Sequence, residues 1–301
     1  MPEYPETLAK YCTAEAAGKI LSSRQLRWHG PHLLGDPFEL THQSPLGFDP
    51  ATLLDAAIRT ATAMIFAREL PRSNSPLMAV VRRWREEERF DSQEEAEEVL
   101  TELLGRMVDQ RQGALDELMA EWRLFTRQLR ICSFAAKPDN LACWQRYADN
   151  HRGAVIRFRC GEYTSLAEPR AVQYQSVRPE ITTVKEQLNA LLHNESVNAR
   201  ERFLDKFLIK PVQANAEQEW RCFRHATDEP SSKQPDDRLW YDDHPFERAE
   251  VGAVYFGAFM DIEDKQKLLS ILREHYSEAT VFEAEPIPGK YDIAFTRIPL
   301  T

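Results

Sequence analysis

The chain has 301 residues and a formal net charge of −10, from 48 acidic and 38 basic side chains. Hydrophobic residues make up 43% and charged residues 29%, as is typical of globular proteins that bury a sizeable core. The acidic balance disfavours a general nucleic-acid-binding role, and no stretch approaches the roughly 20 apolar residues that cross a bilayer.

The five cysteines are dispersed, and none forms a Cys-x-x-Cys pair. This pattern disfavours a zinc ribbon or a redox motif and fits reduced, buried thiols in the cytosol. The segment from Met1 to Lys10 lacks the basic start and the apolar run of a secretion signal. We therefore expect a cytoplasmic protein with no membrane partner.

The first elements are a short strand ending near Tyr11, a helix over Ala14–Ser22 with Thr13 as N-cap, and a strand over Leu26–Trp28. A loop follows that is punctuated by glycine and proline. From about residue 51 to 127 the pattern becomes helical throughout. It predicts helices over Ala51–Leu70 and Leu77–Glu88 and a third around Val99–Phe125.

The loop after the second strand contains Asp36-Pro37-Phe38-Glu39. Because Asp side chains accept backbone N–H groups, Asp36 is expected to cap a rigid turn, with Phe38 as a buried plug. In the alternative interpretation, Asp36 and Glu39 line one cleft together with Glu219.

The strand signal returns after the helical region. Strands are expected at Leu129–Phe134, Ala154–Phe158, Ala171–Tyr174, Glu219–Phe223, Val251–Phe256, Thr280–Glu283 and Ile293–Ile298. Helices are expected over Glu180–Lys210, broken near Asn194, and over Glu263–Tyr276, with Asp228–His244 as a surface loop. The chain thus predicts one α+β domain over residues 1–301, with a mixed or antiparallel β core and an all-helical insertion at about 51–127.

The segment Trp144–Gly153 predicts a helix on which Trp144, Tyr147, Ala148 and His151 form one stripe. Trp144 would pack on the sheet, and Gly153 would stop the helix. Tyr147 and His151 are polar groups on this stripe, so they could face a cleft. An unperturbed histidine titrates near neutral pH and could act as an acid or a base, although such a residue is more often a hydrogen-bonding group at a helix end.

Most standard catalytic signatures are absent from the sequence, including phosphate-binding loops, zinc-protease helices and nucleophile elbows. His29 and His32 lie three residues apart with Asp36 nearby. Gly30-Pro31 between them excludes a regular helical pair of ligands. We therefore expect no metal site.

The informative constellation is Glu217-x-Glu219, at the start of a predicted strand. In an extended chain, alternate residues point to one side, which would place both carboxylates on one face. Two such carboxylates repel each other unless they are solvated or given a cationic partner. The alternative interpretation is a salt-bridge network with Arg221, Lys206 or Lys210.

Seven segments form a recognisable series along the chain: Lys10–Thr13, Leu26–Trp28, Gly35–Glu39, Cys132–Phe134, Trp144–Gly153, Val172–Tyr174 and Lys206–Arg221. In this order they resemble the domain-of-unknown-function family 2971, a widespread bacterial family. The run from Trp144 to Gly153 is the most specific match. Gly35 departs from the Asn that the family usually shows before Asp-Pro-Phe. The resemblance covers nearly the whole chain outside the helical insertion, but it implies no reaction.

The chain is also similar, in residue order, to ADP-ribosyltransferases. These enzymes present an aromatic or basic residue on an early strand, a serine on a middle strand, and Glu-x-Glu or Gln-x-Glu on a late strand. The corresponding residues here are Tyr11 with Thr13, then Ser133, then Glu217-x-Glu219. The usual first-position Arg or His is missing, and only Lys10 and Tyr11 are available there.

That similarity implies roles. Glu219 would stabilise the cation that forms as nicotinamide leaves, and Glu217 would orient or deprotonate the acceptor. Tyr11 would border the nicotinamide, and Lys10 or Thr13 would contact ribose or phosphate. Ser133 would hold the central strand beneath the cofactor. As further cofactor-binding candidates we name Tyr147 and His151.

Two hypotheses follow. The first is an NAD-using ADP-ribosyltransferase-like enzyme or toxin with an unknown macromolecular or small-molecule target. The second is a non-enzymatic ligand- or protein-binding module, for example in phage defence. A nuclease would need a metal held by clustered acids, which the spacing of Asp36, Glu39, Glu217 and Glu219 does not favour.

Overall fold

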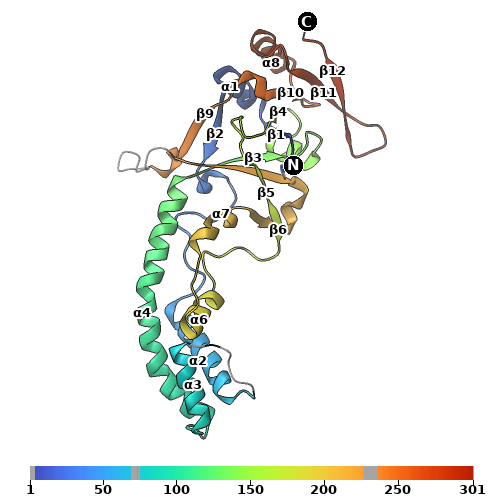
Figure 1. Ribbon diagram of the computed structural model, residues 1–301. Coiled ribbons are helices and arrows are strands. Elements are labelled where there is room, and N and C mark those ends of the chain that lie inside the picture. The colour runs from blue at the N-terminus through green and yellow to red at the C-terminus, as the bar shows by residue number, and fades with distance from the viewer. Residues whose placement is uncertain (1–3, 69–72, 74, 227–235, 301) are drawn as a thin grey trace. The chain divides into compact units, whose positions relative to one another are not determined.

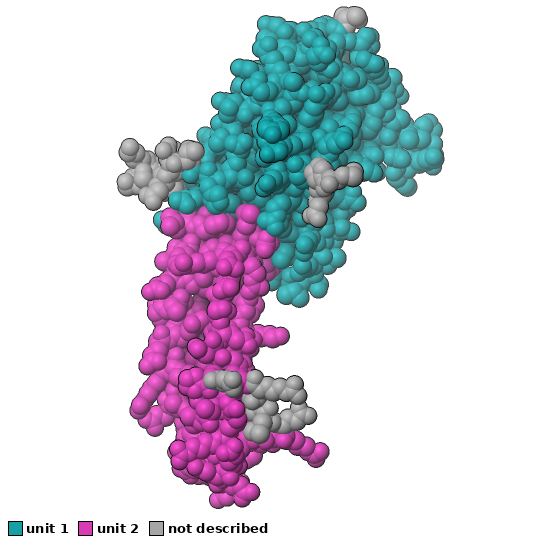
Figure 2. Space-filling view, in the orientation of Figure 1, with its two compact units in different colours: residues 1–39, 126–178, 207–301 teal, residues 40–125, 179–206 magenta. Residues whose placement is uncertain are grey.

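A computed structural model describes residues 4–68, 73, 75–226 and 236–300. It has the α+β fold that the sequence predicts, with a mixed sheet and helices. The chain divides into two compact units, coloured separately in Figure 2. Unit 1 comprises residues 1–39, 126–178 and 207–301, and unit 2 comprises residues 40–125 and 179–206.

Ten strands form the main sheet within the described part of unit 1, and most of them pair antiparallel. The strand order is β12-β11-β10-β4-β1-β3-β2-β9, and β8 pairs with both β3 and β5. The strands are β1 (Thr7–Cys12), β2 (Gln25–His29), β3 (Leu129–Ala135), β4 (Ala154–Arg159), β5 (Arg170–Ala171), β8 (Glu219–His225), β9 (Tyr241–Pro245), β10 (Val251–Phe256), β11 (Thr280–Pro286) and β12 (Ile293–Ile298). A separate two-stranded parallel sheet joins β6 (Gln173–Gln175) to β7 (Ile209–Pro211).

Helices pack on both faces of the main sheet. Figure 1 shows α1 and α8 side by side next to its strands. On one face, α1 (Ala14–Ser23) and α8 (Ile262–His275) pack on strand side chains such as Ile156 and Phe158. On the other face, α5 (Leu141–Tyr147) contributes Trp144 to a smaller apolar cluster. As predicted, Thr13 caps α1 by accepting a hydrogen bond from the backbone N–H of Ala16.

Unit 2 is helical. Its helices are α2 (Pro50–Phe66), α3 (Pro76–Glu86), α4 (Gln93–Gln128, whose last three residues belong to unit 1), α6 (Val184–His193) and α7 (Phe203–Lys206). Leu191 and Leu192 of α6 share a core with the side chains of α2, α3 and α4. The predicted helical insertion therefore contains the expected helices, and a second chain segment completes its core. Whether the chain folds as one domain stays a prediction.

In the described residues, no helix combines the length and the apolar character needed to cross a bilayer. Even α4, with 36 residues, carries charged side chains along its whole length.

Three sequence predictions were wrong in part. In the segment Glu180–Lys210, the predicted break near Asn194 is confirmed, because α6 stops at this residue, which adopts a left-handed φ of 57°. The predicted helix beyond the break is wrong for the most part, because only the short α7 forms there and the chain enters β7 at Ile209. The expected strand at Ala171–Tyr174 is two strands in two sheets. The end of the predicted Ala51–Leu70 helix and the start of the predicted Asp228–His244 loop lie outside the described residues.

The described part of that loop also differs from the prediction. Tyr241–Pro245 forms strand β9, which pairs antiparallel with β2. Two cross-strand contacts of Arg27 compensate for the polar sequence of β9. Its guanidinium hydrogen-bonds both carboxylate oxygens of Asp243 at 2.8 Å and lies 3.9 Å from the centre of the Tyr241 ring.

Candidate functional site

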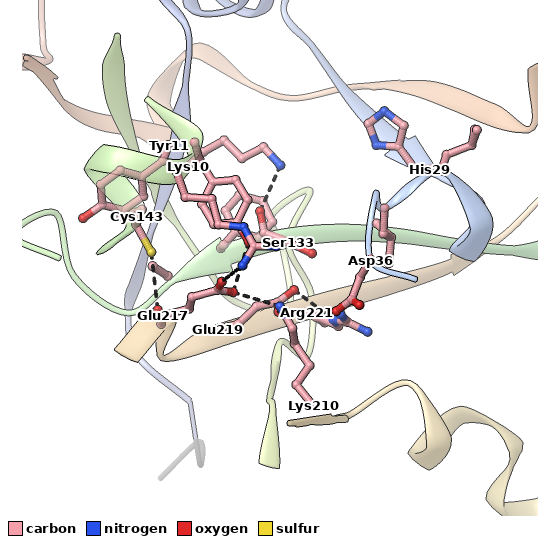
Figure 3. Close-up of a pocket in the computed structure, with 17 residues that line it drawn as sticks. Lys10, Tyr11, His29, Asp36, Ser133, Cys143, Lys210, Glu217, Glu219 and Arg221 are labelled. Atoms are coloured by element: carbon pink, nitrogen blue, oxygen red, sulfur yellow. Dashed lines mark hydrogen bonds and ion pairs between the residues drawn. The ribbon is translucent and has the colours of Figure 1, made fainter. Parts of the chain in front are cut away.

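A cavity of about 240 Å³ opens in unit 1 beside the point where β1 and β3 meet (Figure 3). These two strands are paired at Ala9 and Ala135. The lining side chains come from β1, β2, β3, β7 and β8, from α5, and from the segments before β8 and after β2. They are Ala9, Lys10, Tyr11, His29, Leu33, Leu34, Asp36, Ser133, Phe134, Ala135, Cys143, Arg146, Tyr147, Lys210, Glu217, Glu219 and Arg221.

Glu217 and Glu219 both line this cavity, but an extended chain is not the reason. Glu217 ends a 3-10 helix, η3 (Val212–Glu217), and Glu219 begins β8. Between them, Gln218 adopts a left-handed conformation with φ 46°. The predicted common face is therefore produced by a tight turn, and the two carboxylates are 5% and 7% exposed.

Glu217 is held by three donors. Arg146 donates to Oε1 at 2.8 Å, while Lys210 and the Tyr147 hydroxyl donate to Oε2 at 2.8 and 3.0 Å. The backbone carbonyl of Glu217 also accepts a hydrogen bond from the Asn140 side chain at 3.1 Å. This carboxylate is thus firmly anchored before any ligand binds.

Glu219 belongs to the same network through two cations. Arg221 Nε donates to its Oε1 at 2.9 Å, and Lys210 Nζ lies 3.0 Å from its Oε2. Although this second distance is that of an ion pair, Oε2 accepts no hydrogen bond of good geometry from the described residues. Arg221 also makes a two-pronged contact with the buried Glu39, at 2.8 Å for both bonds.

The predicted alternative of a salt-bridge network therefore describes the geometry, with the buried Arg221 and Lys210 and the more exposed Arg146 as its cations. Carboxylates and cations alternate from Glu39 through Arg221, Glu219 and Lys210 to Glu217. Alternation satisfies each buried charge, which would otherwise be strongly unfavourable inside a protein.

The network sets the charge of Glu219. Burial by itself would raise the pKa of this carboxyl, but the charges of Arg221 and Lys210, with hydrogen bonds from Arg221 and Ser133, lower it to about 2. Burial would likewise lower the pKa of Lys210, yet Glu219 and Glu217 raise it above its usual value. Both groups are therefore charged at neutral pH.

Lys10 and Ser133 reach the same cavity from β1 and β3. Lys10 Nζ donates to the backbone carbonyl of Ser133 at 2.9 Å and lies 5.2 Å from the centre of the Phe134 ring. Among the described residues, the Lys10 ammonium forms no ion pair with a carboxylate. Because β3 pairs with both β1 and β8, Lys10, Ser133 and Glu219 lie on three neighbouring strands.

Tyr11 lines the cavity, whereas Thr13 does not. The Tyr11 hydroxyl donates to the carbonyl of Lys137 at 2.8 Å and accepts from the N–H of Asn140 at 3.0 Å. Its ring packs edge-on against Trp144. The hydroxyl of Thr13 caps α1 instead.

Tyr147 and His151 were predicted to share one helical stripe, which is wrong. The helix α5 ends at Tyr147, and Asp149, Asn150 and His151 all have positive φ values, of 47°, 49° and 67°. Asp and Asn tolerate this left-handed region, so the chain turns away there. Tyr147 lines the cavity, while His151 stacks on Trp144 outside the lining.

Gly153 is the residue that this turn requires. A Cβ at this position would lie 2.2 Å from the backbone carbonyl of Cys12. The glycine therefore allows the chain to pass close to β1 as β4 begins, rather than stopping a helix as predicted.

The turn at Asp36 is confirmed in part. Asp36 Oδ1 accepts the backbone N–H of Phe38 at 2.9 Å, as predicted for a cap. Phe38 is 62% exposed, so the expectation of a buried plug is wrong. Asp36 lines the same cavity as Glu219, and Glu39 is buried against Arg221.

Two further lining residues, His29 and Cys143, were not predicted as site residues. Burial, followed by the nearby charges of Lys10 and Arg27, lowers the pKa of His29 to about 4, so its imidazole is neutral at pH 7. Burial and the charges of Glu217 and Glu219 raise the pKa of Cys143 to about 12. The Cys143 thiol is therefore a packing group and not a nucleophile at neutral pH.

Three comparisons with known proteins were made. No protein-family model, no curated protein and no solved structure matches the chain. In the described residues, no group of three or more His, Cys, Asp or Glu side chains is placed to hold a metal ion.

Proposed function

We propose that the cavity binds NAD and transfers its ADP-ribose unit to a macromolecular or small-molecule acceptor. The observation that supports this proposal is the convergence of Lys10, Ser133 and Glu219, from three neighbouring strands, on one cavity. Their order along the chain is also the order of the corresponding elements in ADP-ribosyltransferases. Lys10 would take the place of the usual Arg or His.

Glu219 is suited to the role that this reaction needs. NAD supplies a glycosidic C–N bond whose cleavage leaves positive charge on the ribose. Glu219 is ionised and held in place by Arg221 and Lys210, so it is already oriented to stabilise such a charge. Its Oε2 is buried at 3.0 Å from Lys210 Nζ, so the charge of the carboxylate is fixed in place before a ligand binds.

The size of the cavity fits one end of the ligand. Its volume of about 240 Å³ lies just below the range of roughly 300–1,000 Å³ that is common for complete small-molecule sites. We therefore place the nicotinamide ribose in the cavity and the rest of the dinucleotide outside it. Transfer forms a bond from the acceptor to the ribose, nicotinamide leaves with the electrons of the broken C–N bond, and the acceptor loses a proton.

A second candidate is a binding module that holds a polar ligand without reaction. Its support is the saturation of Glu217, whose two oxygens already accept from Arg146, Lys210 and Tyr147. A carboxylate in this state is a weaker candidate for deprotonating an acceptor. In this candidate the partner would be a protein or a ligand, for example in phage defence.

We also propose, from the segment Trp144–Gly153, membership of the domain-of-unknown-function family 2971. The setting proposed with it is the cytoplasm of a bacterial cell, where NAD is plentiful and reduced cysteines are stable. A toxin that modifies a cellular target would fit the same chemistry.

Nicotinamide release from NAD is the deciding measurement, together with a thermal-shift titration with NAD. At 100 times its dissociation constant, a ligand stabilises a fold by about 2.7 kcal/mol, which moves the melt visibly. We expect both signals from the wild type and a loss of release of roughly 100-fold or more in Glu219→Gln. The matched control is Glu250→Gln, which removes a buried carboxylate of unit 1 outside the cavity.

A shift with NAD but no release would favour the binding module. If well-folded protein shows neither a thermal shift with NAD nor nicotinamide release, the use of NAD is contradicted altogether. Equal losses in Glu219→Gln and Glu250→Gln would indicate general damage to the fold rather than a catalytic role.

A further inference from the structure

Lys210 is a buried lysine that touches both carboxylates of the turn. Its Nζ lies 2.8 Å from Glu217 Oε2 and 3.0 Å from Glu219 Oε2, and the residue is 6% exposed. Figure 3 shows it approaching the turn from the strand β7. A single cation thus bridges two anions that are separated by one residue in the chain.

The small sheet that carries Lys210 also holds the backbone of the turn. The Tyr174 hydroxyl, from β6, accepts the backbone N–H of Glu219 at 2.8 Å. The carbonyl of Glu219 accepts the N–H of Val172 at 3.0 Å, and the N–H of Gln173 donates to Leu208 at 2.7 Å. The β6 side of this sheet is therefore hydrogen-bonded to the backbone of Glu219, and Gln173 at the start of β6 is hydrogen-bonded to Leu208 just before β7.

The other cations cannot replace Lys210 in this place. Arg221 divides its donors between Glu219, Glu39 and the carbonyl of Phe207. Arg146 contacts Glu217, and its side chain is 54% exposed. Without Lys210, Glu217 and Glu219 would repel each other across the single residue Gln218.

We propose that Lys210 is a positioning residue, which holds Glu217 and Glu219 in one arrangement and supplies the positive charge between them. This inference rests on the proposed function in so far as Glu219 is the group that stabilises the ribose cation. It adds to that function a residue from a separate sheet that acts on the reaction through Glu219.

Other groups also face Glu219, and they determine what a change at Lys210 can do. They are Arg221 from β8, Ser133 from β3, Tyr174 from β6, Glu217 from η3, and Cys143 and Tyr147 from α5. Arg221 stays in place when Lys210 is changed, so Glu219 should keep part of its stabilisation. An opposite charge at this distance favours the ionised carboxylate and lowers the pKa of the carboxyl group by about 1–3.

The test compares Lys210→Met with Lys210→Arg, which keeps the charge. The control is Lys265→Met, which removes a lysine paired with Glu283 elsewhere in unit 1. The Glu219 carboxyl is titrated by carbon NMR in protein labelled at glutamate side chains, and its signal is assigned by its absence in Glu219→Gln. Nicotinamide release is measured over the same pH range.

We expect the pH midpoint of the Glu219 titration to rise by about 1–3 pH units in Lys210→Met. In Lys210→Arg and Lys265→Met it should rise by much less. The acid limb of nicotinamide release should move upward with it, because the ionised carboxylate is the active form. A purely structural role would lower the rate at every pH without moving this limb.

The proposal is overturned if the Glu219 carboxyl of folded Lys210→Met has the same titration midpoint as in the wild type. Should Lys210→Met fail to fold, the pair Lys210→Met with Glu217→Gln removes one charge of each sign and is measured in its place. If the wild type releases no nicotinamide, the proposed function fails, while the NMR titration still decides whether Lys210 controls Glu219.

Discussion

The ion pairs of the cavity and those of the unit 2 helices differ in almost every physical respect. In the cavity, Arg221, Glu219 and Lys210 are less than 9% exposed, and each of the two cations contacts two carboxylates, one of which, Glu39, lies 182 positions from Arg221. In unit 2, Arg106 pairs with Glu102 one helical turn away, and both side chains are 75% exposed. Similar distances therefore describe two very different interactions.

The difference indicates where charge matters in this protein. An exposed pair gains little, because water screens it and two long side chains must be ordered. A buried pair must first lose its hydration, which its partner only partly restores, so replacement by apolar side chains often does no harm. A buried network of several charges beside a cavity is thus more simply explained by a functional role than by stability.

The largest effect is expected from breaking the centre of the buried network. Arg221→Met leaves Glu39 and Glu219 buried without their shared cation. Removal of one partner from a buried ion pair destabilises a protein by about 3–5 kcal/mol. Urea unfolding of this variant should show a loss of that size relative to the wild type.

Two further variants make this test specific. Arg221→Lys keeps the charge but cannot reproduce the two-pronged contact with Glu39, so it should lose less than Arg221→Met. The triple change Arg221→Met with Glu39→Gln and Glu219→Gln removes the stranded carboxylates and should recover part of the stability. A triple variant as unstable as Arg221→Met would mean that packing, and not charge, is what Arg221 provides.

A smaller effect is expected from pH. The pKa of Glu219 is about 2 in the fold against an ordinary value of 4.5, so the group stabilises the fold fully above about pH 4.5. This stabilisation, on the order of 3 kcal/mol, should be lost as the pH falls from about 4.5 towards 2. Over that range the unfolded state binds the proton first, which is why stability decreases with falling pH.

The measurement is the free energy of unfolding as a function of pH in the wild type and in Glu219→Gln. The wild type should show the steeper acid slope, by up to one proton, and the two slopes should agree above pH 5. Glu102→Gln, which removes an exposed carboxylate, should keep the slope of the wild type. Equal slopes in the wild type and Glu219→Gln would show that Glu219 is not held ionised by its cations.

The smallest effect is expected at the surface of unit 2. Arg106→Gln breaks an exposed pair within α4, so the unfolding midpoint should stay within experimental error of the wild type, and added salt should not separate the two proteins. A clear loss of stability in this variant would contradict the contrast between the two regions. Thermal melts at low and high salt provide the measurement.

Many residues of the candidate site could be predicted from the sequence, but the ion pairs among them could not. The motif Glu217-x-Glu219 and the residues Lys10 and Ser133 were predicted and do line one cavity. The pairing of Glu39 with Arg221 joins residues 182 positions apart, which no local pattern reveals. Likewise, His151 was misplaced because three consecutive left-handed residues interrupt a segment whose apolar spacing fits a helix.

The sequence by itself determined the local elements. Thr13 caps α1 as predicted, strands β3, β10 and β12 lie where apolar and β-branched residues gather, and the helices of residues 50–128 follow their apolar spacing. Such features depend on neighbours within a few residues, so the local pattern is sufficient to predict them.

Only the tertiary structure decided how the carboxylates are used. In the fold, Gln218 adopts a left-handed conformation between the two glutamates. The polar segment β9 forms a strand because it pairs with β2. Lys210, from a separate sheet, lies between Glu217 and Glu219. Each of these outcomes depends on how separate strands are brought together in space, and not on the local pattern of the sequence. The charge of a buried carboxylate is set by such neighbours, because desolvation and nearby cations act through space and not along the sequence.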